Sequence, residues 1–178
     1  VGVIALSAKA KMSLSGGNIS GNENRIGVDG TAAGNVSYFS KMGIISLGYT
    51  YLVSDAPSFT MTGGNIMNNT ARYGSALMLD AGTATLSGGS IRNNASVAEL
   101  PNGAPTGWQA SYSPVYVSNT RNTYLQLAGS GCVIDDPIYL ATGRQIILTD
   151  QLRQTSRLYE VYTQSSQAGN VVVIPDCD

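Results

Sequence analysis

The chain has 178 residues, a formal net charge of −1, 12% charged residues and no histidine. Its length fits a single domain, and its low charge argues against electrostatic binding to the phosphates of a nucleic acid. No apolar run is long enough to cross a membrane as a helix, and 21 glycines among many Ser, Thr and Asn residues would interrupt almost every helical window. The composition therefore predicts an all-β domain with no nucleic-acid partner and no transmembrane segment.

The first predicted element is a short alternating strand that recurs five times, at residues 3–6, 49–52, 76–79, 114–117 and 137–140. Side chains two residues apart lie on the same face of a strand, so the aliphatic residues of these segments are expected to form two inward columns. The column between them is predicted to face outward. It consists of Ala5, Tyr51, Met78, Tyr116 and Tyr139.

The second predicted element is a strand with a Gly-Gly bend, at residues 12–19, 59–66 and 84–91, with weaker copies at 125–130 and 146–149. Gly63 and Gly88 are 25 residues apart, whereas Gly16 and Gly63 are 47 apart, which indicates a coil of about 22 to 25 residues plus one insertion. Alternation places two apolar columns inward: Met12, Phe59, Ala84, Leu125 and Ile146, and Leu14, Met61, Leu86, Leu127 and Leu148. The residues predicted to face outward are Ser13, Thr60, Thr85 and Gln126.

An asparagine follows each full Gly-Gly copy at a fixed distance, at Asn22, Asn69 and Asn94. Asparagine suits left-handed turn conformations, and amide side chains in register can bond to one another from coil to coil. We therefore expect these three residues to form a ladder with a structural role.

These elements predict one domain over 1–178, with coils at about 2–24, 48–70, 74–96, 113–135 and 136–163 and a C-terminal cap at about 164–178. Stacked coils would hydrogen-bond in parallel at roughly 4.8 Å per coil. Insertions at about 25–47 and 97–113 both follow the asparagine turn and precede the short alternating strand. Both are therefore expected to leave the stack at the same corner.

The pattern Leu-Ser-Gly-Gly-x-Ile-x-x-Asn, as in residues 86–94, resembles the right-handed parallel β-helix repeats of secreted and surface-anchored bacterial proteins. Residues 136–148 look like the closing coil of such arrays, and the resemblance covers roughly residues 2–163. It implies an all-β, right-handed parallel β-helix (a solenoid) of about five coils with two loop insertions at one corner, on the pectate-lyase-like scaffold. That scaffold carries polysaccharide lyases, hydrolases, adhesins and inert stalks, so the resemblance leaves function open.

Aromatic residues concentrate at one predicted edge, where the two insertions and the outward tyrosine column would meet. Insertions on one edge of a repeat stack often form its binding surface, and flat aromatic rings suit the apolar faces of sugars. The alternative is that these side chains only pack on the rod and on each other. The candidate ligand-binding residues are Trp108, Tyr112, Tyr116, Tyr51 and Tyr38.

The carboxylates are too scattered for us to name a catalytic acid and base pair. Asp55 and Asp80 follow the short alternating strand in equivalent turns and are weak candidates for calcium ligands, since turn-forming aspartates are common there. The adjacent pair Asp135 and Asp136 precedes Pro137 and is expected to face solvent. No catalytic residue, metal site or cofactor is therefore assigned.

The two cysteines, Cys132 and Cys177, could form a disulfide in an oxidising compartment. Cys132 aligns with the inward Ile19, Ile66 and Ile91, so we expect a buried free thiol at this position. The chain starts at Val1 without a Met or a basic leader, which fits either a mature product or a fragment of a longer chain.

Together these features favour a non-catalytic extracellular or cell-surface module that binds glycans or other host or cell-surface ligands, or acts as a spacer. One alternative is a carbohydrate-active enzyme of the lyase or hydrolase kind. Another is a structural subunit that stacks head to tail into filaments through an uncapped end.

Overall fold

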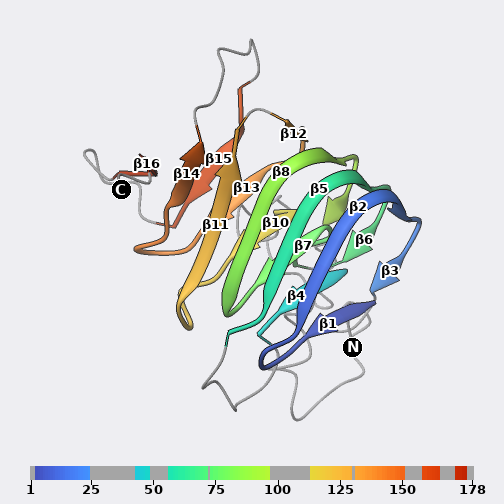
Figure 1. Cartoon of the computed structure of the whole chain (residues 1–178), viewed down its shortest axis with the longest axis horizontal. Helices are drawn as coiled ribbons and strands as arrows, with labels where there is room; N and C mark the ends of the chain where they lie inside the picture. Colours follow the sequence, from blue (N-terminus) through green and yellow to red (C-terminus); the bar gives the residue numbers. More distant parts are fainter. Residues whose placement is uncertain are drawn as a thin grey trace, which may run out of the picture.

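The computed structural model describes residues 3–24, 43–48, 56–71, 73–96, 113–129, 131–150, 158–164 and 171–175. All regular elements in these segments are β-strands, and they form three sheets of parallel strands (Figure 1). Sheet A has six strands in the order β1 (Ile4–Leu6), β4 (Ile45–Leu47), β7 (Leu77–Leu79), β10 (Val115–Val117), β13 (Ile138–Leu140) and β15 (Val161–Thr163).

Sheet B is built from the longer strands that carry the Gly-Gly bend. Its order is β2 (Lys11–Ser20), β5 (Ser58–Met67), β8 (Gly82–Arg92), β11 (Thr123–Ala128), β14 (Ile146–Asp150) and β16 (Val173–Pro175), and β12 (Cys132–Ile134) pairs with the later part of β8. Sheet C contains β3 (Glu23–Asn24), β6 (Thr70–Ala71) and β9 (Ala95–Ser96). β16 lies within 164–178, the range expected to form a cap.

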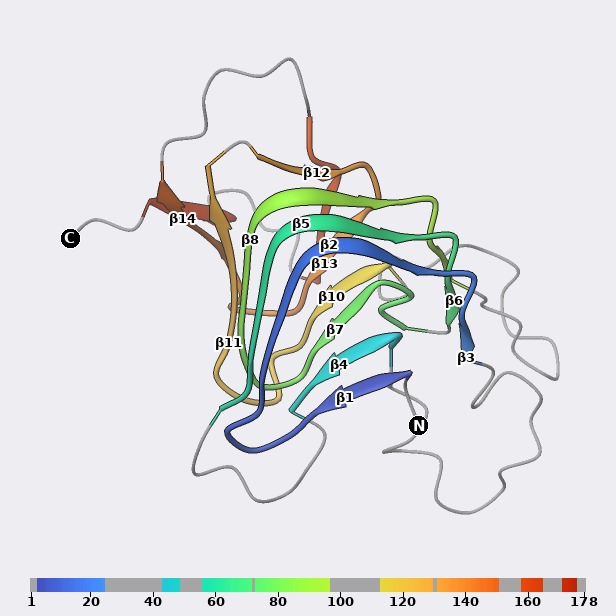
Figure 2. The ribbon, with the colours of Figure 1, turned by 45° about the vertical axis from the view of Figure 1, so that its right-hand side comes forward.

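The chain visits the sheets in a fixed order, so each passage, here called a circuit, adds one strand to sheet A and then extends sheet B (Figure 2). The fourth circuit adds both β11 and β12 to sheet B. The first three circuits, 4–24, 45–71 and 77–96, also add a strand to sheet C. No helix in the described segments could span a membrane.

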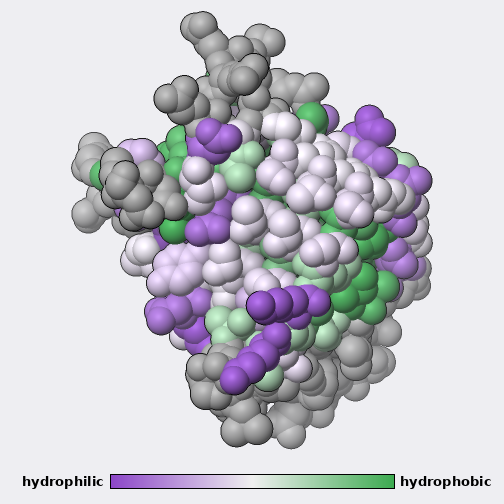
Figure 3. Space-filling view, viewed as in Figure 1, coloured by the Kyte–Doolittle hydropathy of each residue, from purple (hydrophilic) through white to green (hydrophobic). Residues whose placement is uncertain are grey.

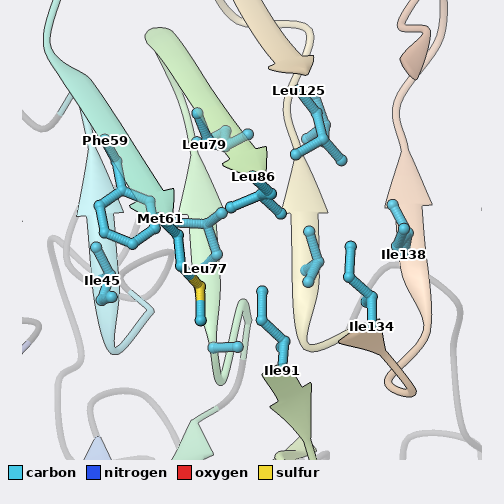
Figure 4. Packing of buried hydrophobic residues seen from close by; sticks show 14 of the residues in the cluster. Ile45, Phe59, Met61, Leu77, Leu79, Leu86, Ile91, Leu125, Ile134 and Ile138 are labelled. Carbon is cyan, nitrogen blue, oxygen red and sulfur yellow. The ribbon is translucent and has the colours of Figure 1, made fainter. Parts of the chain in front are cut away.

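The core lies between the sheets and consists of columns of apolar side chains, one from each circuit (Figure 4). The register pairs Met12 with Phe59, Phe59 with Ala84 and Ala84 with Leu125. A parallel column runs through Leu14, Met61, Leu86, Leu127 and Leu148. Both inward columns predicted for sheet B are therefore confirmed.

The prediction for sheet A was wrong in the second circuit. Residues 45–47, which fall inside the predicted insertion 25–47, form β4 and pair with both β1 and β7. This place was expected for residues 49–52, which lie outside the described residues. Two features favour residues 45–47 as the strand at this place. The small Ser46 is buried. Gly48, with φ of +93°, lies so close to the third circuit that a Cβ would be 2.4 Å from the backbone nitrogen of Ala81.

The Gly-Gly bend is required by close stacking and by backbone conformation together. At Gly88, the first glycine of its pair, a Cβ would lie 2.3 Å from the carbonyl oxygen of Thr62 in the preceding circuit. The second glycine, Gly89, has φ of +87°, a region that other L-residues rarely adopt. Gly16, the equivalent of Gly88 in the first circuit, has nothing within 4 Å of such a Cβ.

Cys132 is inward-facing and 2% exposed, as expected for a buried thiol, and burial raises the pKa of that thiol to about 12. Its predicted alignment was wrong by two residues, because Cys132 pairs with Gly89 and Ile134 pairs with Ile91. The side chain still faces inward because strand faces repeat every two residues. Cys177 lies outside the described residues.

Candidate functional site

The outward column of sheet A changes character along the stack. In register order it reads Ala5, Ser46, Met78, Tyr116, Tyr139 and Tyr162. The last three residues, here called the tyrosine stripe, come from β10, β13 and β15. These three residues come from successive circuits. Parallel strand pairing therefore brings their rings side by side although they are far apart in the sequence.

Tyr116 is the centre of an aromatic cluster. Its ring stacks on that of Tyr139, with centroids 5.0 Å apart and an interplanar angle of 22°. Tyr73, which precedes β7, meets Tyr116 edge to face at 6.0 Å and 80°. Both arrangements are favoured by the ring quadrupoles and hold Tyr116 in one orientation. Tyr116 stays partly exposed, whereas Tyr139 is 7% exposed.

The pKa values of the three residues of the tyrosine stripe are raised, which favours their neutral phenol forms. Burial, followed by the neighbouring Tyr139, Tyr73 and Asp80, raises the pKa of Tyr116 to about 12. Burial also raises the pKa of Tyr139. The hydrogen bond that Tyr162 donates to the Glu160 carboxylate raises the pKa of Tyr162. A neutral phenol can both donate and accept a hydrogen bond, so the stripe offers an uncharged polar edge beside its rings.

In the other half of the column, Ser46 and Met78 are covered by neighbouring segments, whereas Ala5 is exposed. Ser46 is buried and its Oγ accepts a hydrogen bond of 2.9 Å from the backbone N–H of Gly43. Met78 is also buried, and the turn at Gly74 passes directly over its Cβ. Accessible aromatic surface on sheet A is therefore found at the tyrosine stripe.

Of the five predicted ligand-binding residues, the structure describes only Tyr116, which lies in the stripe. Trp108, Tyr112, Tyr51 and Tyr38 lie outside the described residues, so these assignments stay predictions.

Of the two weak calcium candidates, only Asp80 is described, at the corner after β7 near Tyr116; Asp55 lies outside. The described residues contain no group of three or more Cys, Asp or Glu side chains placed to hold a metal ion.

The predicted asparagine ladder is present at the corner between sheets B and C. Asn22 donates its side-chain amide to Asn69 Oδ1 at 2.9 Å, and Asn69 donates to Asn94 Oδ1 at 2.9 Å. The backbone N–H of each donor residue reaches the same oxygen. The left-handed conformation belongs to the residue before each ladder asparagine, as at Asn68 and Asn93, rather than to the asparagine itself.

The ladder ends on a residue that the sequence analysis misplaced. Asp136, expected to face solvent, is 6% exposed, and it accepts the Asn94 side-chain amide at 2.6 Å and the Asn94 backbone N–H at 3.1 Å. Burial raises the pKa of Asp136, while the bonds from Asn94 act in the opposite direction. Asp136 is therefore part of the scaffold.

Two cavities occur near the last circuits, and neither is lined by the tyrosine stripe. One, of about 290 Å³, lies at the corner after β13 beside Arg144. The Arg144 guanidinium is already committed to the carbonyl oxygens of Ser118 and Arg121. The other, of about 280 Å³, is apolar and lies between β14, β15 and β16.

No protein-family model, curated protein or solved structure matches the chain. The evidence for a function is therefore the geometry of the described residues and the sequence pattern.

Proposed function

We propose that the protein is a right-handed parallel β-helix that acts without catalysis as an extracellular or cell-surface module, binding glycans or serving as an adhesive or spacer segment. The fixed order of parallel strands in sheets A and B over successive circuits supports the helix. The location follows from the resemblance of the Gly-Gly repeats to surface-anchored proteins.

The observation that carries the binding proposal is the stack of Tyr116 on Tyr139 with Tyr73 at its edge. A ring held in one orientation loses little conformational entropy when a ligand covers it. The flat, partly exposed face of Tyr116 suits the apolar face of a sugar ring, and the neutral phenols nearby can bond to its hydroxyls.

Further aromatic residues lie close to this stripe in the sequence. Trp108 and Tyr112 precede Tyr116 by eight and four residues, in the segment that joins sheets C and A. Chain length beyond the needs of the repeat is available for ligand contact, and Trp and Tyr are the residues that most often dominate such contacts.

Glycan affinity of the intact chain and of Trp108→Ala tests the proposal. The variant is expected to lose roughly 1 to 3 kcal/mol of binding free energy with nearly unchanged melting temperature. Val173→Ala, which removes an exposed apolar side chain from β16 and lies outside the tyrosine stripe, is the control and should leave this binding intact. A Trp108→Ala protein that mainly unfolds would show that the segment is scaffold and that this site is wrong.

A further inference from the structure

The outer face of sheet B presents two parallel rows of polar side chains across four strands, β2, β5, β8 and β11. The first row, from register partners, is Ser13, Thr60, Thr85 and Gln126. The second is Lys11, Ser58, Thr83 and Tyr124. We call these two rows the hydroxyl face. It lies on a different sheet from the tyrosine stripe.

Within the part of the chain that the structure describes, most of the hydroxyl groups on this face have no hydrogen-bond partner. Within the described part of the chain, Ser13, Ser58, Thr60 and Thr83 make no side-chain hydrogen bond, and all four are at least partly exposed. Only Thr85 uses its hydroxyl, which donates to Gln126 Oε1 at 2.9 Å. Because a hydroxyl both donates and accepts, the rows offer a regular set of unused hydrogen-bonding groups.

The face is nearly free of charge. β5 and β11 contain no charged residue, and β2 and β8 contain one each, Lys11 and Arg92, at strand ends. Much of the surface over these strands is the pale colour of residues with neutral hydropathy (Figure 3). A face with so little charge does not attract an ionic polymer. A neutral polymer can cover it with little desolvation penalty, because almost no charge is buried.

Tyr124 adds an aromatic platform at the β11 end of the second row. It is 43% exposed, and its register partner is Thr83. An isolated exposed aromatic residue needs no explanation, but this one shares a face with unused hydroxyl groups. The combination provides a ring for the apolar face of a sugar and polar partners for the hydroxyls of the next sugars.

We propose that the hydroxyl face binds an uncharged polysaccharide that runs across the strands, with one sugar ring against Tyr124 and its neighbours bonded to the Ser and Thr rows. Neighbouring strands lie about 4.8 Å apart, so the four strands offer about 14 Å of continuous contact. This site goes beyond the proposed function of the tyrosine stripe and is independent of it.

Native gel electrophoresis of the full chain, in gels containing hydroxyethyl cellulose or polygalacturonate, tests the inference. The neutral polymer is expected to retard the protein and the acidic one to leave its mobility unchanged. Tyr124→Ala and the double variant Thr60→Val, Thr83→Val should each weaken the retardation by about tenfold in Kd. Valine keeps the β-branched shape, so the double variant should fold. Thr70→Val, which removes a hydroxyl from sheet C, should behave as wild type.

Three outcomes would overturn the inference: no retardation by the neutral polymer, equal retardation by both polymers, or retardation that survives both hydroxyl-face changes. Trp108→Ala separates the two sites. If Trp108→Ala alone abolishes retardation, the polysaccharide binds at sheet A. The proposed function then stands, and the inference that the hydroxyl face binds polysaccharide is wrong. If hydroxyl-face variants alone lose binding, this inference stands by itself.

Discussion

Asn94 donates both its backbone N–H and its side-chain amide to Asp136 Oδ2, at 3.1 and 2.6 Å, and a carboxylate thereby closes the asparagine ladder. Asn22 begins the ladder as a donor, and Asn69 and Asn94 each accept through the amide oxygen and donate onward through the amide nitrogen. An ionised carboxylate can only accept. Because Asp136 stands where another asparagine could continue the ladder, its ionised form places a charge in a buried position.

Replacing Asp136 by Asn should make folding less dependent on pH. Because the folded-state pKa of Asp136 is raised, its favourable contribution is present below the unfolded value and is lost as pH rises through the folded value. Asp136→Asn keeps an acceptor for Asn94 without the charge, so its unfolding free energy should exceed that of wild type at pH 7. This advantage should shrink toward pH 3 in denaturant titrations.

Two further variants make the Asp136 measurement specific. Asp136→Leu leaves the Asn94 donors unsatisfied and should lower the unfolding free energy by about 1 to 3 kcal/mol. Asp135→Asn, at the exposed neighbour, should leave the unfolding free energy at pH 7 close to that of wild type. An Asp136→Asn protein as unstable at pH 7 as Asp136→Leu would disprove the proposed effect of the buried charge.

Alanine at Gly88 should be far more harmful than alanine at Gly16, although both are the first glycine of a Gly-Gly pair. The new Cβ at Gly88 would lie 2.3 Å from the Thr62 carbonyl oxygen, so Gly88→Ala should reduce stability by about 1 to 3 kcal/mol or more. Gly16 has open space, so Gly16→Ala should be neutral or slightly stabilising. Equal melting temperatures for the two variants would contradict the stacking of circuits.

The register of sheet B predicts opposite results at adjacent residues. Leu86 is fully buried, so Leu86→Ala should reduce the unfolding free energy by roughly 2 to 5 kcal/mol. Thr85 faces outward and bonds only to Gln126, so Thr85→Ala should have a much smaller effect. Urea denaturation of both proteins measures the difference, and similar losses would refute the register.

Tyr116 should be among the last tyrosines to ionise. With its pKa near 12, the neutral form is favoured in the folded state, and the associated stability is lost as pH rises from about 10 through about 12. Absorbance titration of tyrosinate should therefore show a late component that is absent from Tyr116→Phe. A wild-type curve complete near pH 10 would show that the aromatic cluster is not packed as described.

The inward columns of sheet B could be predicted because alternation and the Gly-Gly bend fix register together: once Gly63 and Gly88 are aligned, Phe59 and Ala84 must coincide. The second strand of sheet A could not, since residues 45–47 and 49–52 both alternate. The choice between them depends on contacts between circuits, such as that of Gly48 with Ala81, which no local pattern records.

Asp136 was missed for a different reason. Ile134 pairs with Ile91. Asp136 follows Ile134 by two residues, whereas Asn94 follows Ile91 by three. The turn before the ladder position is therefore one residue shorter in the fourth circuit. The outward column of sheet A was recognisable from period-two alternation, but Ser46 holds the place expected for Tyr51, and the sequence analysis did not include Tyr162. What the sequence did not reveal is that Tyr139 is covered while Tyr116 stays accessible, because exposure depends on neighbouring segments.

A glycan array probed with the intact chain and with Tyr116→Leu tests the central claim most directly. Leucine keeps apolar volume while removing the ring that stacks on Tyr139, and the melting temperature of the variant establishes that it is folded. We predict that wild type is retained on a defined subset of glycans and that folded Tyr116→Leu loses this retention. Absence of retention by wild type, or the same pattern and strength of retention by the variant, would contradict glycan binding at the tyrosine stripe.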